Sequence, residues 1–326
     1  MMSLKSLVIL VAFFLTGCSG SNRNSESKTF KVATFTWVGY APINLAKEKG
    51  FFEGVEVELS KIDDTAARRA ALSSGQVNGS VDIVDSFVCA RSSGVPASVV
   101  LKLDDSIGGD GIVAKKSIKS ITDLRGKTVA FPKDQPSHFF LLSLLEKEGM
   151  SMKDLTGKGV NEADQAGNAF VSGSVDAAVT WEPYLTKAAQ MPDGHILTSS
   201  RETPGLIVDV FTVRDDYLKS NPKEVEAFIK GWFKAVQYWK DNPSDANEIM
   251  AKALKLETKE FSEMIKGIKY ADLEENQAFF KFDGNGSSRF TVLAGQASKV
   301  WVREGIITKE VAPASIDGSQ IVQAVK

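Results

Sequence analysis

The residues best suited to chemistry in this sequence are Trp181 and Glu182, which directly follow the short apolar run 177–180. Gly173 precedes the run and Pro183 follows the pair, and these residue types end helices and strands, respectively. The pair is therefore predicted to lie in a loop at the carboxyl end of a buried strand, where open α/β sheets bind ligands. In the alternative interpretation, Trp181 is a core aromatic residue and Glu182 a charge at a helix start.

Two further aromatic rings, Trp37 and Tyr40, lie on either side of Gly39 in a loop predicted at residues 36–42. A strand is expected before this loop and a helix after it. Because the free N–H groups and the positive dipole end of that helix point at the loop, we predict that Trp37, Gly39 and Tyr40 contact a ligand.

Carboxylates occur at comparable positions elsewhere in the chain. Four acids are candidates for the same cleft: Asp64, Asp85, Asp110 and Asp209. Asp85 and its neighbour Ser86 follow a predicted strand, and Asp110 lies in a glycine-rich segment that is a candidate crossing between lobes. Asp209 interrupts an apolar run, where an acid must find a partner or face a cleft. Asp64 can instead cap the helix that begins near residue 66.

Ser137 and His138 stand at the start of a helix predicted to extend to residue 148. Ser137 is expected to be its N-cap, and a hydroxyl there can cap the helix or turn to a ligand. The chain has only two histidines, so a metal site would rest largely on carboxylates. Since the zinc, hydrolase and redox motifs are also missing from the sequence, we expect no enzyme, no cofactor and no metal site.

Two sequence patterns each occur twice in the chain, and most of the candidate residues lie in or near these repeats. Residues 71–81 are repeated in pattern at 169–179, an offset of 98 residues, and the strand–loop–helix pattern that starts at Lys31 returns at Lys127. Two similar units at nearly one offset predict two α/β lobes with a cleft between them.

The N-terminus resembles a bacterial lipoprotein signal. Lys5 precedes a short apolar run, and residues 15–18 (Leu-Thr-Gly-Cys) are similar to a lipobox. We therefore expect residues 1–17 to be removed as a signal peptide. Cys18 would then be lipidated and residues 18–28 would form a flexible tether, which predicts an exported protein anchored to a membrane by lipid. The alternative is an ordinary signal peptide with an incidental cysteine.

Charge and cysteine content exclude other classes. The 326-residue chain has a net charge of −2 and lacks the basic run typical of nucleic-acid binding. With Cys18 lipidated, Cys89 is the only cysteine left, so an intramolecular disulfide is not expected.

Two segments resemble one family: residues 39–52, with Gly-Tyr-Ala-Pro followed by Leu-Ala-Lys-Glu-Lys-Gly-Phe-Phe, and residues 169–184. The chain is similar to the nitrate/sulfonate/taurine-type solute-binding proteins of bacterial ABC importers, a group that includes binders of thiamin-precursor pyrimidines. This resemblance implies an α/β, type II periplasmic binding protein fold with two crossover strands. It places lobe 1 at residues 29–111 plus 206–326 and lobe 2 at residues 112–205. It also implies a small-molecule ligand, hinge closure, permease and ATPase partners, and a monomer.

The predicted cleft is unusual for an anion binder. Its candidate acids (Asp64, Asp85, Asp110, Glu182 and Asp209) outnumber its candidate cations, Lys133 and His138. A field of carboxylates opposes a sulfonate or nitrate, whereas carboxylates beside aromatic faces suit cations and N–H-rich solutes. We therefore predict a small nitrogen-rich ligand, such as an amine, guanidinium, amide or aminopyrimidine. The alternatives are a sulfonate, taurine or nitrate ligand, or else a periplasmic sensory module or an enzyme of the same fold.

Overall fold

The computed structural model describes residues 29–325, so the predicted signal peptide, Cys18 and the tether lie outside it. The described part of the chain begins in a six-stranded mixed sheet with the order β11-β4-β10-β3-β1-β2. Its strands are β1 (Thr29–Thr34), β2 (Glu56–Lys61), β3 (Gly79–Ile83), β4 (Ala97–Ser106), β10 (Val208–Arg214) and β11 (Ile268–Tyr270). The strand β1 pairs in parallel with β2 and β3, whereas β10 runs antiparallel to both β3 and β4.

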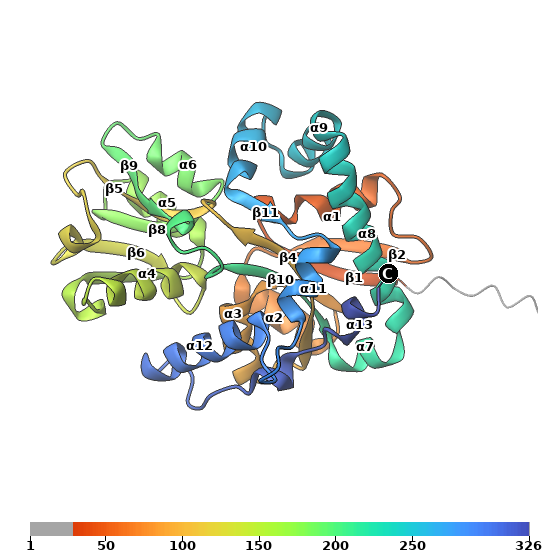
Figure 1. The fold of residues 1–326 in the computed structure, drawn as a ribbon. Coiled ribbons are helices and arrows are strands. Elements are labelled where there is room, and N and C mark those ends of the chain that lie inside the picture. The colour runs from red at the N-terminus through yellow and green to blue at the C-terminus, as the bar shows by residue number, and fades with distance from the viewer. Residues whose placement is uncertain (1–28, 326) are drawn as a thin grey trace, which may run out of the picture.

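A second, five-stranded sheet has the order β7-β6-β8-β5-β9 and lies beside the first (Figure 1). Its strands are β5 (Asp110–Lys115), β6 (Thr128–Pro132), β7 (Thr156–Val160), β8 (Ala177–Trp181) and β9 (Gly194–Ser199). The chain passes between the sheets twice, from β4 to β5 and from β9 back to β10. The predicted two-lobed α/β fold with two crossings is confirmed.

Helices cover both sheets. Those that precede β5 or follow β10 are α1 (Ala41–Glu48), α2 (Thr65–Ser74), α3 (Val84–Ser92), α7 (Asp215–Ser220), α8 (Pro222–Asp241), α9 (Pro243–Leu254), α10 (Thr258–Met264), α11 (Leu273–Phe280), α12 (Arg289–Arg303) and α13 (Gln320–Gln323). The helices α4 (Pro136–Lys147), α5 (Ala163–Val171) and α6 (Tyr184–Ala189) lie between β5 and β9 in the sequence. We call the six-stranded sheet with its helices the first unit and the five-stranded sheet with these three helices the second unit. In the first unit α1 packs on α8 and α9, and α3 packs on α12 across the sheet from them (Figure 1).

The apolar stripe of α8 fixes that helix to the first sheet. Phe228 stacks on Phe211 of β10 with ring centroids 4.2 Å apart, and it meets Phe30 of β1 edge-on. Burying one such side chain stabilises the fold by roughly 1.5–3 kcal/mol. Within residues 29–325, no helix combines the length and the apolar character needed to cross a membrane.

Candidate ligand-binding site

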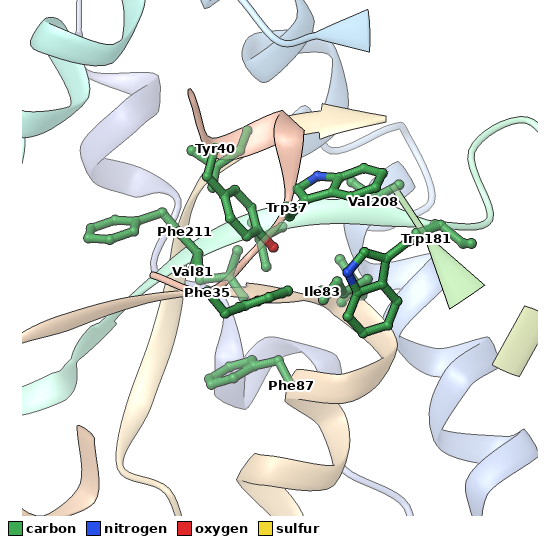
Figure 2. Packing of buried hydrophobic residues seen from close by; sticks show 14 of the residues in the cluster. Phe35, Trp37, Tyr40, Val81, Ile83, Phe87, Trp181, Val208 and Phe211 are labelled. Carbon is green, nitrogen blue, oxygen red and sulfur yellow. The ribbon is translucent and has the colours of Figure 1, made fainter. Parts of the chain in front are cut away.

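A narrow cavity lies where the two sheets meet. Its lining residues come from both units and from the segment that joins them: Phe35, Trp37, Ile83, Asp110, Pro136, Trp181, Ile207 and Asp209. Figure 2 shows the rings of Phe35, Trp37 and Trp181 converging with Ile83 at this place. The cavity volume of about 10 Å³ leaves room for roughly one water molecule. A solute the size of an amino acid therefore requires the two units to separate before it can enter.

Trp181 ends β8 and reaches across to the first unit. Its indole N–H donates to the backbone oxygen of Thr36 at 3.1 Å, and its ring lies 6.1 Å from that of Phe35. It is also the register partner of Asp110 on β5. The strand end thus brings an aromatic ring and a carboxyl group to one wall of the cavity.

Asp110 and Asp209, which line the cavity from opposite units, are only 3% and 2% exposed. Burial raises the pKa of Asp110 to about 7, against a smaller lowering by the Ser106 hydroxyl. Burial also raises the pKa of Asp209 well above its ordinary value, and the charge of Asp104 adds to this effect. The Asp110 carboxyl group therefore exchanges its proton near neutral pH, and burial disfavours the charged form of Asp209 as well.

Two aromatic donors hold the acids of the first sheet. The Tyr40 hydroxyl donates to Asp209, and the Trp37 indole donates to Asp104 at 3.4 Å. A Cβ atom at Gly39 would overlap both the Trp37 indole nitrogen and the Asp104 carboxylate. Gly39 is therefore needed for this close approach, while Tyr40 acts through Asp209 and is not itself among the residues that line the cavity.

The sequence predicted Asp85 to lie at a turn after a strand. In the structure it is instead the second residue of α3. Neither of its carboxyl oxygens has a hydrogen-bond partner among the described residues. Burial and the charge of Asp82 raise its pKa to about 8. The neighbouring Ser86 accepts a hydrogen bond from Arg69 at 2.9 Å.

Ser137 and His138 also differ from expectation. The helix begins at Pro136 with Gln135 as its N-cap, so Ser137 lies inside the first turn instead of capping it. Its buried hydroxyl has no partner in the part of the chain that the structure covers. His138 stacks on Phe131 at 4.7 Å, and burial lowers its pKa to about 4, which leaves its ring neutral at physiological pH.

Asp64 and Glu182 lie away from the cavity. Asp64 caps α2, accepting from the N–H of Ala67 at 2.6 Å, which is the alternative role that the sequence offered. Glu182 accepts from the N–H and the hydroxyl of Thr186 at 3.1 and 2.7 Å. It lines a separate cavity of about 630 Å³, because the chain turns into α6 directly after β8.

Sequence reasoning missed several wall residues and two acids. Phe35, Ile83, Pro136 and Ile207 complete the lining, and Asp82 and Asp104 add buried charge beside it. The adjacent acids Asp104 and Asp105 are visible in the sequence, and the structure has both within β4. Among residues 29–325, no group of three metal-ligating side chains is arranged to hold a metal ion.

Known proteins similar to this chain agree with the geometry. The family described as NMT1/THI5 like matches residues 37–246. A putative aliphatic sulfonates-binding protein of Bacillus subtilis is 26% identical over 273 residues, which are 80% of this chain and 82% of that protein. The taurine-binding periplasmic protein of Escherichia coli is 31% identical over 210 residues, 63% of each chain.

The fold has solved counterparts. The crystal structure of the periplasmic aliphatic sulphonate binding protein from Escherichia coli superposes with a TM-score of 0.75 at 17% identity, covering 90% of this chain and 99% of that one. The family match spans more than half of the chain and includes most of the residues that line the cavity. The chain therefore belongs to the NMT1/THI5-like family and has the fold of the periplasmic binding proteins.

Proposed function

We propose that this protein is the solute-binding component of an ABC uptake system, which captures a small polar molecule between its two lobes and delivers it to a membrane permease. The observation that carries this proposal is the cavity at the junction of the sheets, with a carboxyl group from each unit and three aromatic rings. The names of the sulfonate-binding and taurine-binding relatives support it. Such a role requires no turnover of the solute, and we assign no catalytic residue.

We further propose that the ligand carries a cationic or N–H-rich nitrogen group. None of the residues that line the cavity is basic, whereas Asp110 and Asp209 offer acceptor oxygens and Trp37 and Trp181 offer ring faces. This combination favours charge-assisted hydrogen bonds and cation–π contact. Asp85, with two partnerless oxygens nearby, can add a third acceptor.

An aliphatic sulfonate is the second candidate, favoured by the relatives and by the start of α4. Helix N-termini bind anions through their free N–H groups, and Pro136 lines the cavity while the buried Ser137 hydroxyl next to it has no partner within residues 29–325. Taurine has both an ammonium and a sulfonate group, so it satisfies the acids and the helix start together.

Calorimetric titration of protein stripped of solute by unfolding and refolding tests these alternatives. The probes are guanidinium, formylaminopyrimidine, taurine and ethanesulfonate, which has the sulfonate but lacks the amine. Binding of guanidinium, formylaminopyrimidine or taurine without ethanesulfonate supports the nitrogen subsite. Equal binding of taurine and ethanesulfonate contradicts it and supports sulfonate recognition alone.

We also propose that the protein is exported and held to a membrane by lipid on Cys18, with residues 1–17 removed, and that it acts as a monomer. The lobes are taken as residues 29–111 with 206–326 and residues 112–205. The lipobox-like residues 15–18 support the anchor. Labelling with radioactive palmitate should mark the protein, and Cys18→Ala should abolish the label and release the protein from membranes. Retention of the label in that variant would rule out this attachment site.

A further inference from the structure

A carboxylate of one unit binds the start of a helix in the other. Glu162, in the loop between β7 and α5, accepts from the backbone N–H of Thr65 at 2.8 Å and from the Thr65 hydroxyl at 3.2 Å. Thr65 is the first residue of α2. The two residues are 97 positions apart and belong to different sheets, so the contact bridges the two units.

The side chain of Glu162 makes no hydrogen bond to the start of its own helix, α5. Glu162 is nonetheless the N-cap residue of that helix. The neighbouring acid, Asp164, accepts only from the N–H of Gln165, within α5 itself. Of these two carboxylates at the start of α5, one serves the local helix and the other reaches across the molecule.

The backbone N–H of Thr65, at the start of α2, can donate a hydrogen bond to a group outside the helix. The first N–H groups of a helix have no partner inside the helix, and the helix dipole favours negative charge there. Asp64 satisfies the N–H of Ala67, whereas the N–H of Thr65 is satisfied by Glu162. Burial raises the pKa of Glu162, and the hydrogen bond from the Thr65 N–H and the charge of Arg68, one turn later, oppose this shift only in part.

The contact lies along a groove that shares Phe35 and Trp181 with the binding cavity. This groove of about 260 Å³ is lined from one side by Thr36 and Asp64 and from the other by Glu162 and Trp181. Trp181 also lines the binding cavity, and its hydrogen bond to Thr36 is a second bridge along the same groove. When the units separate, both bridges must break.

We infer that Glu162 and Thr65 form a latch that holds the two lobes closed, by capping α2 from the opposite lobe. The latch exists only in the closed arrangement, so it stabilises that arrangement relative to the open one without touching the ligand. It therefore controls the rate of opening, and hence of ligand release, for any ligand. This inference goes beyond the proposed function, because closure can be measured with no solute present.

Three variants isolate the latch. Glu162→Ala removes the acceptor, and Asp164→Ala is the matched control, because it removes one acid from the same helix start. Thr65→Pro removes the donor N–H from the other side. Proline is well tolerated at the first position of a helix, and Asp64 before it has φ −66° and ψ 117°, the extended conformation that a following proline requires.

Small-angle X-ray scattering of the solute-free protein gives the first readout. Glu162→Ala and Thr65→Pro should each increase the radius of gyration relative to the wild type, and the double variant should add nothing further. Asp164→Ala should match the wild type. A radius for Glu162→Ala equal to that of Asp164→Ala, or an increase in only one of the two latch variants, would overturn the inference.

Stopped-flow tryptophan fluorescence with taurine gives the second readout, since Trp37 and Trp181 line the cavity. Loss of the latch should raise the dissociation rate roughly tenfold, equivalent to about 1.4 kcal/mol, with little change in association. Slower association with unchanged dissociation would contradict a latch. If taurine does not bind the wild type, that result counts against the taurine candidate alone, and the scattering measurement still decides the latch.

Discussion

Asp104 and Asp209 face each other as register partners on the adjacent antiparallel strands β4 and β10. Like charges directly opposite each other destabilise a sheet, and burial together with this mutual charge raises the pKa of Asp209 well above its ordinary value. The Trp37 indole and the Tyr40 hydroxyl each donate to one member of the pair. The fold thus maintains an unfavourable pair beside its cavity, which is understandable if a ligand complements it.

Replacing one member of this pair should stabilise the protein. Asp209→Asn replaces a buried acid whose ionisation is disfavoured by burial and by Asp104. The new amide can donate to Asp104, whose Oδ1 has no partner among the described residues. We expect urea denaturation to show a gain of about 1 kcal/mol in the free energy of unfolding, together with loss of affinity for a cationic ligand.

Asp105→Asn is the control with the opposite sign. Asp105 pairs with the fully buried Lys102 at 2.6 Å, while Glu275 lies farther from the same ammonium group at 3.7 Å. Removing one partner of a buried ion pair costs about 3–5 kcal/mol. If Asp209→Asn also destabilises the protein to that extent, the pair is held by contacts that favour its charge, and the proposed trade of stability for binding is wrong.

The free energy of unfolding should depend on pH through the ionisation of Asp110. Its pKa is about 7 in the folded protein and about 3.9 in an unfolded chain. Between these values the folded state holds the extra proton, so the contribution of Asp110 to stability declines as the pH rises from about 4 to 7, by up to about 1.4 kcal/mol per pH unit.

Asp110→Asn lacks this dependence. The difference in unfolding free energy, variant minus wild type, should therefore increase from pH 4 to 7 and level off above pH 7. Urea titrations at pH 4.5, 6, 7 and 8.5 measure it. A difference that stays constant over this range would mean that Asp110 is already ionised at low pH.

Much of the site could be predicted because strand ends are readable in the sequence. Trp181 was predicted from a strand end, Trp37 from a loop before a helix, Asp110 from a glycine-rich crossing and Asp209 from an acid inside an apolar run. All four line the cavity. Glu182 shows the limit of this rule. It follows Trp181 directly, yet the turn into α6 directs its carboxylate to a different cavity.

Long-range contacts were beyond the sequence for a different reason. The partner of Glu162 is 97 residues away, and neither residue stands out locally, since an acid at a helix start is expected to interact with the N-terminus of that same helix. The first turn of α4 was likewise displaced, because Pro136 can begin a helix and thereby moves Ser137 inside it. The Glu162 contact depends on how the two lobes dock, whereas the start of α4 is set locally by Pro136.

Gly39→Ala should disrupt the site although the change is a single methyl group. The new Cβ would overlap the Trp37 indole and the Asp104 carboxylate, so one of these buried groups must move. Overpacking of this kind costs about 1–3 kcal/mol. The matched control is Gly284→Ala, where a Cβ meets no atom within 4 Å. Thermal unfolding and near-ultraviolet circular dichroism should distinguish the two variants, and equal effects would contradict the packing role.

His138 should behave as a neutral core residue. Burial lowers its pKa to about 4, and its ring lies 5.5 Å from that of Trp301 as well as against Phe131. Nuclear magnetic resonance titration should show no change in its imidazole between pH 5.5 and 8. A midpoint near 6.5 for His138 would mean that the ring is hydrated and available to bind an anion.

The pH dependence of binding should reveal the charge that the cavity recognises. The pKa values of Asp110 and Asp85 are about 7 and 8, because burial disfavours their charged forms. A cationic group binds the ionised forms and displaces protons, so the affinity for guanidinium should increase from pH 6 to 8.5. A sulfonate is repelled by these same ionised forms and is bound better by neutral carboxyl groups, so the affinity for ethanesulfonate should decrease over this range. Calorimetry in two buffers of different ionisation enthalpy counts the protons that are released or taken up when the ligand binds.

Proton release on binding indicates a cation site, and proton uptake indicates a sulfonate site. If Asp85→Asn and Asp110→Asn leave the proton count unchanged, these acids do not face the ligand.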